Sequence, residues 1–178
     1  MVVKLEKQVE SKLIYELEWF KFTVDDVIIG DEQKATRIVV DHPGAASILA
    51  VTQDDKVILV SQFRYPTNEV LYEIPAGKLD SWGGDFYDTA LREFAEETPF
   101  TAERMELLYG FYTCPGFSNE FIHLYKAHGI SQNNEYNLDD DEYVEIHYFT
   151  KKEVKNLLET SEIRDAKTII ALQYWLNE

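Results

Sequence analysis

The chain has 178 residues, of which 45% are hydrophobic and 13% aromatic, enough for one domain with a substantial core and too few for two of ordinary size. Lysine and arginine total 17 against 33 aspartates and glutamates, a formal charge of −16, and this field opposes nonspecific contact with nucleic acid or an anionic membrane. The single cysteine excludes an internal disulfide, and the absence of a long apolar run or a secretory signal predicts a cytoplasmic protein without a membrane span.

The N-terminal part of the sequence has the pattern of β structure. Turn signals at residues 29–31, 42–44 and 53–55 separate short segments rich in β-branched and aromatic residues. These segments predict mostly antiparallel strands at residues 13–18, 20–29, 36–41, 45–51 and 56–63.

A strand, a loop and an acidic helix follow in that order. Residues 71–77, LYEIPAG, alternate apolar and polar side chains until Pro75 and Gly77 interrupt them, and residues 78–84 form a loop with a pair of glycines. The next segment predicts a helix from Asp85 to about Thr98. Asp85 favours the helix start, and Pro99 cannot continue it.

Three glutamates of this helix, Glu93, Glu96 and Glu97, fall within about 100° of arc. Such like charges repel each other unless a cation, an arginine or water separates them. The preceding loop can bring a backbone carbonyl near Ala76 or Gly77 against the carboxylates, which gives the all-oxygen surroundings that Mg²⁺ or Mn²⁺ prefers. The pattern therefore indicates a divalent-cation site, and the alternative is a solvated amphipathic helix with ion pairs.

The C-terminal part alternates further strands with two helices. We expect strands at residues 106–113, 120–126 and 142–149, a polar loop at 131–141, and helices at 151–158 and 167–176. Thr150 is the expected N-cap of the first helix, and Asp165 or Ala166 opens the second. Strands covered by helices predict an α/β sandwich over a mixed sheet.

The acidic helix and its loop match a known motif. Residues 77–100, GKLDSWGGDFYDTALREFAEETPF, resemble the Nudix box, G-x5-E-x7-R-E-U-x-E-E-x-G-U with U aliphatic. Gly77, Arg92 and the three glutamates stand at matching places. The spacing from Gly77 to Arg92 is one residue longer than the pattern, its first glutamate has no equivalent, and Pro99 replaces its final glycine.

The likeness covers most of the chain. GAASILAV, KVILVSQFRYP, EIPAGKLD, CPGFSNEFIHLY and DEYVEIHYFT resemble the ADP-ribose pyrophosphatase branch of the Nudix family, and Pro115 matches a proline typical of that branch. The resemblance implies an α/β fold, namely a Nudix-type α/β/α sandwich over a mixed sheet, with an N-terminal antiparallel β region. Residues 1–43 would be this region and help to pair two subunits into a homodimer, and residues 44–178 would form the catalytic core.

The resemblance also implies Mg²⁺-dependent hydrolysis of ADP-ribose to AMP and ribose 5-phosphate, with Mn²⁺ as a substitute cation. Glu93 and Glu97 would be the main catalytic metal ligands, Glu96 a further ligand directly or through water, and Ala76 a backbone ligand. Hydrolysis of another nucleoside diphosphate derivative, such as a nucleotide sugar or a dinucleotide, stays open, as does a module that binds nucleotide without cleaving it.

Other roles are implied for residues outside the box. The general base matches Glu142 best, with Asp140 and Asp141 as alternatives from the same polar loop.

Arg64 stands where the family binds a substrate phosphate, and a guanidinium suits that task. Arg37 is a second candidate, and Phe117 is expected to line the pocket. Trp19 matches an aromatic residue that stacks on adenine in some relatives, although packing in the core or a dimer is an alternative role.

Overall fold

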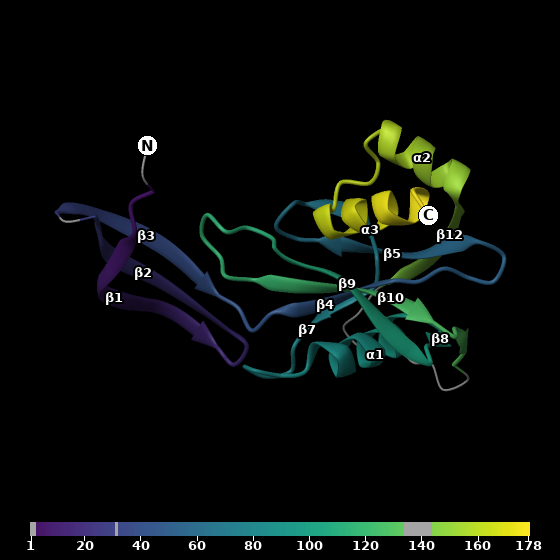
Figure 1. Ribbon diagram of the computed structural model, residues 1–178, viewed down its shortest axis with the longest axis horizontal. Helices are drawn as coiled ribbons and strands as arrows, with labels where there is room; N and C mark the ends of the chain where they lie inside the picture. Colours follow the sequence, from purple (N-terminus) through teal and green to yellow (C-terminus); the bar gives the residue numbers. More distant parts are fainter. Residues whose placement is uncertain (1–2, 31, 134–143) are drawn as a thin grey trace.

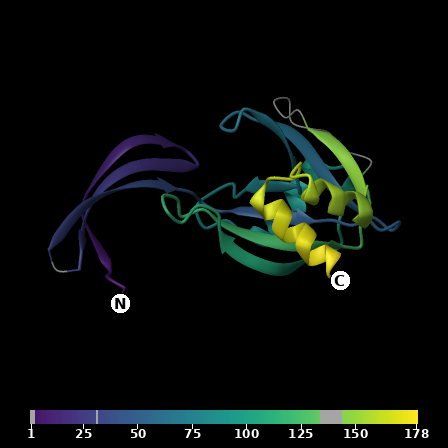
Figure 2. The same cartoon turned by 90° about the horizontal axis from the view of Figure 1, so that it is seen from above.

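An antiparallel sheet of three strands forms the N-terminal part of the computed structural model, which describes residues 3–30, 32–133 and 144–178. Its order is β1 (Glu6–Leu17), β2 (Phe20–Ile29) and β3 (Gln33–Asp41). The sheet stands apart from the other elements in two perpendicular views (Figures 1 and 2). The predicted first strand, residues 13–18, begins too late, since β1 begins at Glu6. Every residue of β1 is exposed, so no buried face requires alternating apolar and polar residues in the sequence.

The rest of the described chain forms a sandwich. Helix α1 (Phe86–Glu97) lies on one side of the central strands, and α2 (Lys151–Glu159) and α3 (Ala166–Leu176) lie on the other (Figure 1). One sheet has the order β7-β4-β10-β9 and a second has the order β12-β5-β6, and β4 runs parallel to β10 while the other pairs are antiparallel. The predicted α/β/α sandwich over a mixed sheet is therefore confirmed. The remaining strands are β4 (Ala45–Leu49), β5 (Lys56–Arg64), β6 (Glu69–Glu73), β7 (Ala76–Lys78), β8 (Phe100–Thr101), β9 (Arg104–Tyr112), β10 (Phe121–His128), β11 (Ser131–Gln132) and β12 (Glu145–Thr150).

Two apolar clusters hold these layers together. Ile48 and Ile58 point toward α1 and pack in one cluster with Phe94, whereas their neighbours Leu49 and Leu59 belong to the cluster under α2 and α3. All five side chains are fully buried. The alternation follows from the two-residue period of a strand, which sends successive side chains to opposite faces. The apolar side chains are therefore consecutive at the end of β4 (Ile48 and Leu49) and within β5 (residues 57–60).

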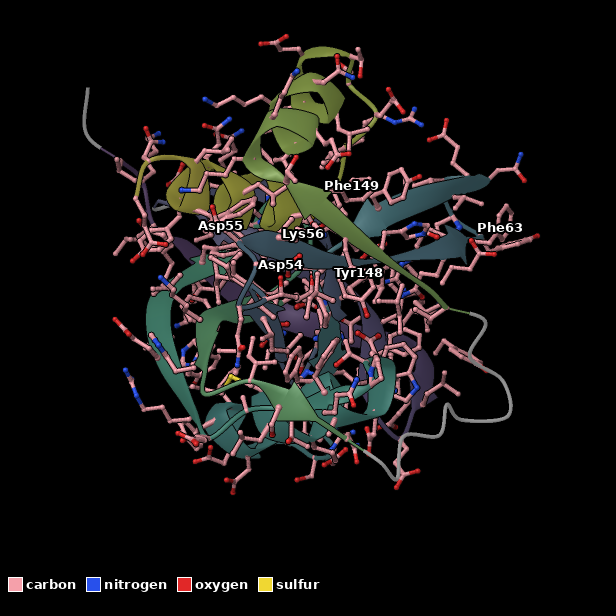
Figure 3. All side chains as sticks on the ribbon, turned by 90° about the vertical axis from the view of Figure 1, so that its right-hand side faces the viewer. Asp54, Asp55, Lys56, Phe63, Tyr148 and Phe149 are labelled. Carbon is pink, nitrogen blue, oxygen red and sulfur yellow. The ribbon has the colours of Figure 1, made fainter. Side chains whose placement is uncertain are left out.

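Strand β5 runs from the turn at Lys56 to Arg64, which lies beside the charged residue Glu73. Figure 3 shows the turn before Lys56 at one end of β5 and Phe63 at the other, with Tyr148 and Phe149 on the adjacent β12. Tyr148 pairs with Ile58 in this antiparallel register. The strand ends at Arg64, next to β6.

The ends of the helices follow from their sequences. Asp85 caps α1 by accepting hydrogen bonds from the backbone N–H groups of the next turn, and Thr150 forms a capping box on α2. Helix α1 ends at Thr98, which is extended with φ −135° and ψ 153°, the conformation that a following proline favours. Pro99 thus stands in the place of the box glycine, and neither Thr98 nor Pro99 has a positive φ. None of the described helices is long and apolar enough to cross a membrane.

Candidate active site

Two of the three glutamates on α1 face the interior. Glu93 and Glu97 are 9% and 3% exposed, whereas 42% of the Glu96 side chain is exposed. Their i, i+4 spacing places Glu93 and Glu97 one turn apart on the same helix face, beside the fully buried Phe94. The acidic arc therefore lies at the edge of the core, with its third member directed toward solvent.

Strand β7 meets the same face of α1. The backbone N–H of Ala76 donates to Oε2 of Glu97 at 2.9 Å. A Cβ atom added to Gly77 would lie 1.8 Å from the carboxyl carbon of Glu93, so only a residue without a side chain leaves room for this carboxylate. Strand β7 and α1 thus lie in contact through the N–H of Ala76 and the backbone of Gly77, and the predicted approach of a carbonyl oxygen stays a prediction. The roles of these groups as metal ligands stay predictions.

Arg92 balances the charge of the acidic arc. Its guanidinium contacts Oδ1 of Asp80 at 2.8 Å, Oε1 of Glu93 at 2.7 Å and Oε2 of Glu96 at 2.5 Å. Burial alone would lower the pKa of Arg92, but the charges of Glu93 and Glu96 outweigh it and raise that pKa. Because Asp80 lies in the loop before α1, the arginine joins helix and loop.

A cavity of about 500 Å³ opens beside these groups. It brings together residues from the acidic helix, strand β7, the end of β5 and the start of α3. Its lining comprises His42, Ala45, Gln62, Arg64, Ala76, Gly77, Lys78, Glu93, Glu97, Thr113, Cys114, Glu120, Ile122, Asp165, Ala166 and Lys167. Of the predicted site residues, the cavity contains Arg64, Ala76, Glu93 and Glu97.

A second charged cluster lies on the cavity wall. The guanidinium of Arg64 donates to Oε1 and Oε2 of Glu73 at 2.7 and 2.8 Å, and Lys167 donates to the same carboxylate. Burial alone would raise the pKa of Glu73, but the hydrogen bond from Arg64 and the charge of Lys167 lower it to about 2. Glu73 and Lys167 were not predicted from the sequence. The available signal was a charged residue in the apolar strand pattern LYEI.

The other predicted substrate-binding residues lie outside the lining of the cavity in this single chain. Arg37 is on the N-terminal sheet, where it pairs with Glu6 at 2.5 Å. The Trp19 ring lies 5.9 Å from that of His42, which does line the cavity. Phe117 is 53% exposed, and its backbone oxygen accepts a hydrogen bond from β3. Trp19 is therefore near the rim, Phe117 lies in the turn after Cys114, which lines the cavity, and Arg37 lies on β3.

The buried oxygens fit a hard divalent cation. Among the described residues, no three histidine, cysteine, aspartate or glutamate side chains are already gathered in a metal-binding group, and Glu96 is paired with Arg92 at the exposed edge. Glu93, Glu97 and the backbone of Ala76 nevertheless share one cavity, and carboxylate and carbonyl oxygens are the ligands that Mg²⁺ or Mn²⁺ prefers. The predicted general base, Glu142, and its alternatives lie outside the described residues.

Comparison with known proteins agrees with this geometry. Residues 41–172 match the model of the NUDIX domain. The chain is 42% identical to the methanol dehydrogenase activator of Bacillus methanolicus and 41% identical to the ADP-ribose pyrophosphatase of Bacillus subtilis (strain 168), in each case over 95% of this chain and 91% of the relative. It is 30% identical to the GDP-mannose pyrophosphatase of Yersinia enterocolitica over 98% of this chain and 96% of the relative.

A solved structure shows the same fold. The crystal structure of an ADP compounds hydrolase superposes with a TM-score of 0.82 at 18% identity, over 99% of this chain and 97% of the other.

Proposed function

The chain belongs to the Nudix family, and from this premise we propose that it hydrolyses the pyrophosphate bond of ADP-ribose to AMP and ribose 5-phosphate with Mg²⁺ as the activating cation. As a Nudix hydrolase it cleaves a pyrophosphate bond, and enzymes of this family generally use divalent metal ions. The relative from Bacillus subtilis supports ADP-ribose as the substrate. The single observation that carries the proposal is that the buried carboxylates of Glu93 and Glu97 share one cavity with Arg64.

The acidic side of this cavity would hold the cation. Glu93, Glu97 and the carbonyl of Ala76 would supply oxygens, and Glu96 is proposed to contribute through water. When bound, Mg²⁺ neutralises charge on the phosphate oxygens, polarises phosphorus and makes a water molecule a stronger nucleophile. Arg92 keeps the carboxylates of Glu93 and Glu96 in place by its ion pairs with α1, and it also pairs with Asp80 in the preceding loop.

The basic side would receive the pyrophosphate. The guanidinium of Arg64 lies close enough to Glu97 for that charge to contribute to raising the pKa of Arg64, after the larger effect of its hydrogen bond to Glu73. A diphosphate in the cavity would therefore have the cation site and a guanidinium within reach. Glu142 is proposed as the general base that orients the attacking water, with Asp140 and Asp141 as alternatives.

Nucleotide sugars are the second candidate substrates. The specific observation in their favour is the 30% identity to a GDP-mannose pyrophosphatase over 98% of this chain. Because both substrates carry the same pyrophosphate, the carboxylates of the cation site do not distinguish them. The distinction has to come from contacts to the base and the sugar.

A second copy of this chain is the proposed partner. The N-terminal sheet leaves a group of apolar side chains exposed, more than a solvated sheet needs. These are Val9, Leu13, Ile14, Tyr15, Leu17 and Ile38. A homodimer paired through this sheet, which stands apart from the sandwich in Figure 2, would cover them and would carry Arg37 toward the pocket of the other subunit. Sedimentation equilibrium tests this: we expect the mass of two chains, and the mass of one chain at assay concentration would refute it.

The test of the proposed function is a substrate panel. Purified protein is incubated with ADP-ribose, GDP-mannose or NAD over a range of Mg²⁺ concentrations, and nucleoside monophosphate release is followed by chromatography. We expect release of AMP from ADP-ribose at the highest kcat/KM and no release in the presence of a chelator. A higher kcat/KM on GDP-mannose than on ADP-ribose would make GDP-mannose the proposed substrate instead. Tight binding of ADP-ribose without product at any Mg²⁺ concentration would favour a nucleotide-sensing module instead.

A further inference from the structure

Three charged side chains from three elements meet beside the cavity, where Arg64 and Lys167 line the wall and Glu73 lies behind them. Glu73 is the last residue of β6, Arg64 is the last residue of β5, and Lys167 lies in the first turn of α3. The carboxylate of Glu73 is the centre of this group, since both cations donate to it. Asp165 completes the group at 3.1 Å from Nζ of Lys167. Two cations and two carboxylates thus balance without any substrate.

The bonds of Arg64 fix its orientation. Glu73 accepts from Nε and Nη2 in the bidentate arrangement that sets the plane of a guanidinium. Within the described part of the chain, these two bonds leave the Nη1 hydrogens of Arg64 available to an anion, and 40% of the side chain is exposed, whereas Glu73 is 3% exposed. The carboxylate therefore lies behind the guanidinium, on the side away from solvent.

Lys167 holds the carboxylate from the opposite element. Nζ of Lys167 contacts Oε2 of Glu73, the oxygen that also accepts from Nη2 of Arg64. Both partners are almost fully buried, with 10% and 3% of their side chains exposed. A buried carboxylate with partners on two elements has little freedom to change rotamer.

We propose that Glu73 is a positioning residue for the pyrophosphate: it aims the guanidinium of Arg64 into the cavity, and Lys167 locks its carboxylate in the orientation that this requires. The inference rests on the proposed function, because the anion that Arg64 receives is the diphosphate of the substrate. Glu73 does not touch the substrate. Its effect is transmitted through Arg64.

The position of Glu73 also explains why a neutral residue in its place would orient Arg64 less well. Without the charge of Glu73, the guanidinium of Arg64 loses two charge-assisted hydrogen bonds. It can then turn toward Glu97, whose negative charge already contributes to raising the pKa of Arg64. Arg64 would then compete with the cation for a carboxylate instead of binding the phosphate. The expected consequence is weaker binding of substrate, with the chemistry on bound substrate changed less.

The test compares Glu73→Gln with a matched control from the same strand. Glu69 begins β6 and pairs with Arg164 at 2.9 Å, but both side chains are exposed. In steady-state kinetics with ADP-ribose, we expect E73Q to raise KM about 10-fold to 100-fold, the effect of losing hydrogen bonds to a charged group, with a smaller change in kcat. E69Q should resemble the wild type. Equal KM values for E73Q and E69Q would overturn the inference.

A double-mutant cycle separates positioning from a general loss of stability. If Glu73 acts through Arg64, the R64A/E73Q variant should have the same kcat/KM as R64A alone. Losses that multiply would show that Glu73 acts independently of Arg64 and would overturn the proposal. Thermal unfolding is recorded for every variant. If E73Q does not fold, Glu73→Asp takes its place in the same cycle, because it keeps the buried charge but is one methylene too short for the bidentate pair with Arg64; losses that multiply with R64A would again overturn the proposal.

The experiment also distinguishes the two proposals. A wild-type protein that releases no AMP from ADP-ribose overturns the proposed function, and the positioning role falls with it. A wild-type protein that releases AMP, together with an E73Q variant that matches E69Q, overturns the positioning role alone.

Discussion

The substitution Gly77→Ala tests the site through a steric change at one atom. The added Cβ would lie 1.8 Å from Cδ of Glu93 and 2.0 and 2.2 Å from its two oxygens. Since carbon atoms approach to about 3.5 Å, the carboxyl group has to move by roughly 1.7 Å. Glu93 can do so by changing rotamer, which costs about 1 kcal/mol. A displacement of about 1 Å at a catalytic group costs about 100-fold in rate.

We therefore expect G77A to fold with a free energy of unfolding within about 2 kcal/mol of the wild type, while AMP release from ADP-ribose falls at least about 100-fold. Urea denaturation and a continuous assay measure the two quantities on the same preparation. The matched control is Gly116→Ala, because a Cβ at Gly116 meets nothing within 4 Å. Turnover by G77A close to that of G116A would refute the reasoning that the carboxylate of Glu93 must occupy this position.

Three further predictions address other parts of the account. Glu97→Gln keeps the shape of the side chain but removes its charge, so we expect an intact circular dichroism spectrum and turnover reduced by orders of magnitude; wild-type turnover would contradict its role as a ligand. The pKa of Glu73 is lowered from 4.5 to about 2, so its ionised form should add about 3 kcal/mol of stability, which is fully present above the ordinary pKa and is lost as the pH falls toward 2. The difference in urea midpoint between wild type and E73Q should therefore become smaller as the pH is lowered from about 5 to about 2. A difference that stays constant over this range would argue against the stabilising role. Pro99→Gly should lower the free energy of unfolding by about 1 kcal/mol, because the proline favours the extended conformation of Thr98; an unchanged urea midpoint would mean that the proline contributes nothing to the helix exit.

The acidic helix could be predicted because its signals are local. Asp85 caps α1, Pro99 follows its end, and the i, i+4 spacing alone puts Glu93 and Glu97 on one face. The order of strand, loop and helix was enough to predict that the backbone near Gly77 lies close to Glu93. In each case the relevant residues are close in the sequence, so helix and strand geometry determine their arrangement.

The basic side of the cavity could not be predicted in this way. Lys167 and Glu73 are 94 residues apart and meet only because α3 packs over β6. Neither periodicity nor spacing in one sequence specifies such a contact. Arg64 was identified by resemblance to a family, but its bond to Glu73 was not, since a bidentate pair depends on the register between β5 and β6.

The N-terminal sheet shows a different limit. All of β1 is exposed in the single chain, so the strand before Leu13 has no buried face that would produce a pattern. The contacts that would explain its apolar residues belong to the proposed second subunit. Arg37 is subject to the same limit, because its place relative to a substrate depends on the dimer.

The central claim is that Glu93, Glu97 and Ala76 hold a divalent cation next to the pyrophosphate. Anomalous diffraction from crystals grown with Mn²⁺ and a non-hydrolysable ADP-ribose analogue tests it most directly. We predict a manganese peak about 2.2 Å from a carboxylate oxygen of Glu93, a carboxylate oxygen of Glu97 and the carbonyl oxygen of Ala76, with Arg64 on the analogue's phosphates. Saturating Mn²⁺ that gives no peak among these oxygens, while the analogue occupies the cavity, would contradict the account.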